Sequence, residues 1–110
     1  MQKYELIISD FAEMDLKEII TYFYNQNIQY SIELYKKIKI RINELELFPE
    51  RGRIVPELEK QGINKYRQII EGNYRIIYLV KNTKINILMI VDSRRNLEEL
   101  LFIKLLKISE

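Results

Sequence analysis

The sequence predicts an α+β fold in which an N-terminal helical hairpin packs on a twisted antiparallel sheet and a short C-terminal helix follows. Two amphipathic helical patterns occupy residues 10–24 and 28–48. Three β-type runs then follow, and short turns at Gly72-Asn73 and at residues 82–84 separate them. Runs joined by such turns predict an antiparallel meander. The 110 residues, of which 47% are hydrophobic, suit one core, so residues 1–110 are expected to form a single domain.

The first two elements are a strand and a helix. Residues 3–9 become apolar toward their end and predict a short strand that pairs with the meander. Asp10 and Glu13 have the spacing of a reciprocal N-terminal cap, so the helix is expected to begin at Asp10. Its apolar positions recur at helical spacing: Ala12, Leu16, Ile19, Ile20 and Phe23.

The second helix is predicted to fold back against the first, because only the polar residues 25–27 separate them. Pro49, which lacks an amide donor, ends its pattern. We expect its apolar stripe to pack against the sheet rather than against a partner. The stripe consists of Ile28, Ile32, Tyr35, Ile38, Ile42 and Leu45.

Residues 49–65 lose all periodicity and contain two prolines and two glycines. Connections of this length without secondary structure are uncommon in compact domains and often have a function. This one is expected to bring Arg53 and Glu57 toward the meander. In the meander, residues 76–80 and 87–91 are almost uninterruptedly apolar, as in strands covered on both faces. A last helix is expected after Asn96, and its apolar side chains favour a partner contact: Leu97, Leu100, Leu101, Leu105 and Ile108.

The composition narrows the possible chemistry. The chain has no cysteine and no histidine, so disulfides, the usual zinc sites and the usual proton shuttle near neutral pH are not expected. We see no glycine-rich phosphate loop and expect neither a metal nor a cofactor. No apolar run approaches the roughly 18 residues of a membrane span, and the first residues do not resemble a signal peptide. The sequence therefore predicts a cytoplasmic protein without a membrane partner.

Basic residues concentrate in the second half of the chain. Residues 51–95 contain ten Lys and Arg against four acids, although the formal net charge of the whole chain is only +2. The planar guanidinium group of arginine can donate two parallel hydrogen bonds to a phosphate or a carboxylate. Four arginines on one sheet face would therefore form an anion-binding site. The four candidates are Arg53, Arg67, Arg75 and Arg95. Ordinary ion pairs, such as Arg53 with Glu57 or Arg67 with Glu71, are the alternative.

Two further groups of residues have a functional and a structural interpretation. Glu57 is a candidate general base if its surroundings raise its pKa, and otherwise a partner in a loop ion pair. Tyr66, Tyr74 and Tyr78 are candidates for stacking on bases. Tyrosine is also common in strands, where it packs in the core or across strands.

Four short motifs, in this order, carry a resemblance to a known family. They are Pro49-x-x-Gly52-Arg53-x-x-Pro56-Glu57, Tyr66-Arg67, Gly72-Asn73-Tyr74-Arg75-Ile76-Ile77-Tyr78 and Val91-x-x-Arg94-Arg95. Together with Asp15-Leu16 and Tyr22 in the first helix, the chain resembles the RelE/ParE superfamily of toxins from bacterial type II toxin–antitoxin systems over essentially its whole length. The resemblance implies an antiparallel sheet with two helices on one side. It also implies a cognate antitoxin protein that wraps the toxin.

The resemblance leaves two main activities open. ParE-like members poison DNA gyrase, and the segment from Val91 to Leu101 looks more like theirs, with Arg53, Arg67, Arg75, Arg94 and Arg95 as target-binding residues. RelE-like members cut mRNA on the ribosome. By resemblance to the YoeB-type relatives among them, Glu57 and Arg75 match a catalytic glutamate and a phosphate-binding arginine, but the C-terminal histidine–tyrosine pair of those relatives is replaced by Asp92-Ser93-Arg94-Arg95. We therefore expect a gyrase inhibitor. The alternatives are an mRNA interferase (an endoribonuclease) or an inactive antitoxin-binding module.

Overall fold

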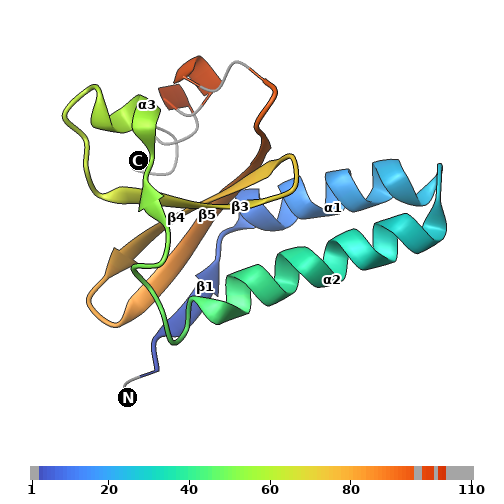
Figure 1. The fold of residues 1–110 in the computed structure, drawn as a ribbon, viewed down its shortest axis with the longest axis horizontal. Coiled ribbons are helices and arrows are strands. Elements are labelled where there is room, and N and C mark those ends of the chain that lie inside the picture. Colours follow the sequence, from blue (N-terminus) through green and yellow to red (C-terminus); the bar gives the residue numbers. More distant parts are fainter. Residues whose placement is uncertain (1–2, 96–97, 101, 104–110) are drawn as a thin grey trace.

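The computed structural model describes residues 3–95, 98–100 and 102–103 (Figure 1). Two helices and a five-stranded sheet make up most of this part of the chain. The elements are β1 (Glu5–Ile8), α1 (Asp10–Tyr24), α2 (Ile28–Glu44), β2 (Arg53–Ile54), α3 (Pro56–Glu59), β3 (Tyr66–Glu71), β4 (Tyr74–Lys81) and β5 (Lys84–Asp92). Residues 98–100 and 102–103 are helical, and the remainder of the expected C-terminal helix lies outside the described residues.

The sheet has the strand order β1-β5-β4-β3-β2. The expected meander is confirmed, because β3, β4 and β5 pair antiparallel in succession. Both turns begin with a residue of left-handed φ, Gly72 at 59° and Asn82 at 57°, a conformation that glycine and asparagine tolerate. Strand β1 does pair with the meander, but it runs parallel to β5, so the sheet is mixed rather than wholly antiparallel.

The helical hairpin covers one face of the sheet (Figure 1). Its first helix is capped by Ser9 rather than by Asp10 as predicted. The Ser9 Oγ accepts a hydrogen bond from the Ala12 amide at 3.1 Å and donates one to the Leu88 carbonyl oxygen at 2.9 Å. Asp10 is the first helical residue, and its negative carboxylate is stabilised there by the positive end of the helix dipole. Ser9 therefore both caps α1 and ties it to β5.

The core lies on both faces of the sheet. On the hairpin side, Ile38 and Ile42 of α2 pack against Ile76, Tyr78 and other strand residues. On the other side, Val55 and Leu58 of the loop–α3 segment pack against Ile77 and Met89, with Leu100 at the edge. Strand β5 contains a β-bulge at Leu88. Ile77 of β4 pairs with Met89 and the next residue, Tyr78, pairs with Ile87, so Leu88 has no partner residue in β4. Leu88 and Met89 therefore both belong to the second core cluster.

The prediction for the α2 stripe is right only for its second half. Ile38, Ile42 and Leu45 are buried, but Ile28, Ile32 and Tyr35 are 40–53% exposed. The far end of the hairpin projects beyond the strands, so no sheet lies beneath it (Figure 1). Ser31 and Leu34 are the buried residues of this half of α2.

The segment 49–65 is more ordered than its sequence indicates. It contains the two-residue edge strand β2, which pairs with Arg67 and Gln68 of β3, and the short helix α3. Pro56 stands at the first position of α3, where a missing amide donor costs nothing. This segment covers the sheet face opposite the hairpin and places Glu57 above it (Figure 1).

Candidate functional site

A buried tyrosine holds the start of the segment that carries Glu57. The Tyr78 hydroxyl donates to the Pro49 carbonyl oxygen at 2.8 Å and accepts from the Gly52 amide at 2.9 Å. Gly52 is required here by close approach, since a Cβ on it would lie 2.4 Å from the Gln68 carbonyl oxygen and 2.7 Å from the Tyr78 hydroxyl. Arg67 Nη1 donates to the Gly52 carbonyl oxygen at 2.7 Å and completes the arrangement. These contacts fix the loop that leads into α3.

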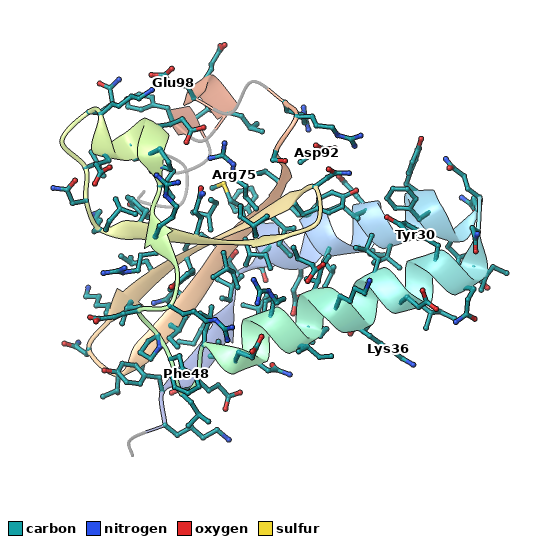
Figure 2. All side chains as sticks on the ribbon, viewed as in Figure 1. Tyr30, Lys36, Phe48, Arg75, Asp92 and Glu98 are labelled. Carbon is teal, nitrogen blue, oxygen red and sulfur yellow. The ribbon has the colours of Figure 1, made fainter. Side chains whose placement is uncertain are left out.

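Arg75 lies near the start of the central strand β4 (Figure 2), and its side chain reaches Glu57 of α3. Its Nη1 donates to Glu57 Oε1 at 2.8 Å and to Gln68 Oε1 at 3.0 Å. The side chains of Arg75 and Glu57 are only 16% and 20% exposed. Glu57 and Arg75, which the sequence singles out as a possible catalytic pair, are thus in direct contact. Gln68, a third member of the group, is buried and was not expected.

The hydrogen bond from Arg75 lowers the pKa of Glu57 below its usual 4.5, and this effect outweighs the opposing effect of burial. A general base for work near neutral pH needs a raised pKa. Glu57 is therefore a weak base that stays ionised, and its geometry is that of an ion pair. Its partner is Arg75 rather than Arg53.

The four arginines do not share one sheet face, so that expectation is wrong. Arg53 pairs with Gln68 and Arg75 with Ile70, which places both on the α3 side. Arg67 pairs with Tyr78, a residue of the hairpin-side core, and lies on the opposite face. Arg95 follows β5 and lines a cavity beside α1. The sequence already implied that Arg67 and Arg75 lie on opposite faces. The turn at Gly72-Asn73 sets Arg75 opposite Ile70. Ile70 is three residues from Arg67 in the same strand, and side chains alternate between the faces, so an odd separation puts the two on opposite faces.

Arg94 and Arg95 stand together at the end of β5. Asp92 holds Arg94 through two contacts, Nε to Oδ1 at 3.0 Å and Nη2 to Oδ2 at 2.6 Å. These bonds lower the pKa of Asp92 to about 2, so its carboxylate is ionised. Both arginines line a cavity of about 410 Å³ between α1 and the strand ends, together with Tyr22 and Tyr74.

The strand tyrosines are mostly unavailable for stacking on bases. Tyr66 and Tyr74 are each 7% exposed and Tyr78 is fully buried. Burial raises the pKa of Tyr74 and of Tyr78, so both hydroxyls stay protonated near neutral pH. The packing role considered for these tyrosines accounts for their burial. Tyr22, in contrast, is 61% exposed.

Within the described ranges, no group of three or more metal-ligating side chains is placed to hold a metal ion. None of the helices described in the structure is long and apolar enough to cross a bilayer.

Comparisons with known proteins identify one family and two solved structures of similar fold. A family model described as "ParE toxin of type II toxin-antitoxin system, parDE" matches residues 6–97. A solved structure titled "Chromosomal ParDE TA system from P. aeruginosa" is similar with a TM-score of 0.66 and 17% identity, over 82% of this chain and 96% of that chain. The RelBE2 toxin–antitoxin complex of Mycobacterium tuberculosis gives a TM-score of 0.55 and 17% identity, over 84% and 93% of the two chains. A search of curated protein sequences finds no significant match.

Proposed function

This chain belongs to the ParE toxin family of type II toxin–antitoxin systems, and from that premise we propose that it stops growth by poisoning DNA gyrase. The toxin acts in the cytoplasm, where it binds gyrase on DNA and halts replication. The family match over residues 6–97 supports this choice against the ribosome-dependent cleavage of mRNA by RelE-like relatives.

One observation supports the choice most directly. Arg75 and Glu57, the residues that a nuclease of this superfamily would use on phosphate and as a base, are bonded to each other at 2.8 Å. The pKa of Glu57 is lowered rather than raised, and the chain has no histidine to act as the acid. A gyrase inhibitor requires no such acid–base pair.

A cognate antitoxin is the second proposed partner. Both structural relatives bear titles that name a toxin–antitoxin system or complex. A groove of about 380 Å³ between α1 and α2 offers an apolar surface for an antitoxin helix. Leu16, Ile20 and Tyr35 are among its lining residues.

Induced expression in a bacterial host, with separate pulse-labelling of DNA and protein synthesis, tests the proposed function. We expect early loss of DNA synthesis with an SOS response, and loss of supercoiling by purified gyrase when the purified toxin is added. Early loss of translation with cut mRNA, abolished by Glu57→Gln, would overturn the proposal in favour of an mRNA interferase. Growth that continues at full rate with folded protein present would favour an inactive antitoxin-binding module.

A further inference from the structure

The groove between α1 and α2 has the shape of a site for a third helix. The two helices lie side by side along its length (Figure 1). On α1 the lining positions fall on successive turns from Ala12 to Thr21, and on α2 they are Tyr35, Lys39 and Ile42. Ten residues of α1 correspond to about 14 Å, at a rise of about 1.5 Å per residue. The groove is therefore long enough for two to three turns of a partner helix.

Most of the lining is apolar. Ile42, which lines the groove from α2, is buried, whereas Leu16 and Ile20 of α1 are only half-buried. Tyr35 is 44% exposed. A helix with apolar side chains three and four residues apart would cover the exposed parts of these side chains, as in other helix-in-groove complexes.

Three charged residues interrupt this apolar surface. Glu13 and Lys17 are four positions apart on α1, a spacing and order at which their charges offset each other. Lys39 lines the groove from α2 and is half-buried. In the part of the chain that the structure describes, its ammonium group has neither a hydrogen bond nor an ion pair. Lys39 is therefore the uncompensated charge of this lining.

The ammonium group of Lys39 restricts what can fill the groove. In the free toxin, water solvates this group. A helix that occupies the groove removes part of that water, and an apolar side chain placed over Lys39 would leave a cation buried without a partner. A carboxylate at the same place would pair with the cation and offset the loss of water.

We propose that the antitoxin helix carries an Asp or Glu that pairs with Lys39, flanked one turn away by apolar residues that contact Tyr35 and Ile42. This inference rests on the proposed function, which assigns the groove to the antitoxin. It makes Lys39 the residue by which the toxin distinguishes its own antitoxin from one with an apolar or basic side chain at that position.

Three variants test the pairing, with the purified cognate antitoxin as the probe. Lys39→Met removes the charge but keeps an unbranched apolar side chain, and Lys39→Glu reverses the charge. Lys36→Glu is the matched control, because Lys36 is an exposed lysine of the same helix outside the groove lining. Circular dichroism and thermal melting of each variant identify any folding defect before the antitoxin affinities are compared.

We expect Lys39→Met to weaken antitoxin binding about tenfold or more and Lys39→Glu to weaken it further, with Lys36→Glu close to the parent protein. Replacing the pairing carboxylate of the antitoxin with Lys should restore binding to Lys39→Glu. Antitoxin binding that is unchanged or tighter in Lys39→Met would overturn the proposal, because it would show that an apolar side chain covers Lys39.

A fourth variant separates this inference from the assignment of the groove. Thr21→Trp adds bulk at an exposed position of the lining. Antitoxin binding that is unaffected by Thr21→Trp would refute the groove as the antitoxin site, and the pairing with it. Binding that is lost in Thr21→Trp but unchanged in both Lys39 variants would refute the pairing alone.

Discussion

The Tyr78 hydroxyl is a single group that satisfies two backbone atoms far away in the chain. Replacing Tyr78 with Phe leaves the Pro49 carbonyl oxygen and the Gly52 amide without their partner in a buried place. We expect Tyr78→Phe to lower the free energy of unfolding by about 1–3 kcal/mol, measured by urea denaturation. Tyr24→Phe, at an exposed position, serves as the control and should have almost no effect. Equal stability of the two variants would contradict the proposed bonding.

Because the pKa of Glu57 is lowered in the folded protein, the stability of the fold depends on pH in the acid range. The folded protein binds a proton at Glu57 less tightly than the unfolded chain does, so its contribution is present above about pH 4.5 and is lost as pH falls below that. We expect the melting temperature to fall below this pH and Glu57→Gln to flatten part of the decline. Asp92, with a pKa of about 2, accounts for a further decline at lower pH, which Asp92→Asn should remove. A decline unchanged in Glu57→Gln would contradict the ion pair.

At the scale of residues, the sequence identifies the members of the site better than their arrangement. Glu57 and Arg75 were both singled out, and they are in contact. Their pairing was not foreseen, because it depends on where α3 crosses the sheet. Gln68 carries no charge and gave no signal.

Helix α1 depends on the cap at Ser9. Ser9→Ala removes both the acceptor for the Ala12 amide and the bond to the Leu88 carbonyl oxygen. We expect a loss of about 1–2 kcal/mol in the free energy of unfolding. Asp10→Ala removes only a favourable charge in the first turn and should cost about 0.3–1 kcal/mol. A larger effect at Asp10 than at Ser9 in denaturation experiments would restore the cap assignment made from the sequence.

At the scale of elements, periodicity predicted the elements with long, regular patterns. It gave α1, α2 and the meander, but it could not tell which half of α2 has a sheet beneath it. Ile32 and Ile38 look alike in sequence, yet only Ile38 is buried. The elements β2 and α3 were missed because two and four residues are too short to establish a period. Pro56 at the start of α3 was the one local signal.

The two core clusters share one sheet, so the whole molecule should unfold in one step. Leu34→Ala opens a cavity on the hairpin side and Leu58→Ala opens one on the α3 side. We expect each to cost about 2–5 kcal/mol and to leave a single transition. Far-UV and near-UV circular dichroism should report the same midpoint for each variant. Separate midpoints in Leu58→Ala would show that the α3 side unfolds independently.

The parallel pairing of β1 with β5 has a consequence for the newly made toxin. Ser9 and Leu88, which bond across this pair, are separated by 79 positions in the chain. A ribosome that adds roughly 5–20 residues per second needs about 4–16 s to make that interval. During this time β1 has no partner strand, and the hairpin lacks the sheet against which it packs. The complete sheet, and any surface that depends on it, can therefore form only several seconds after β1 has been made.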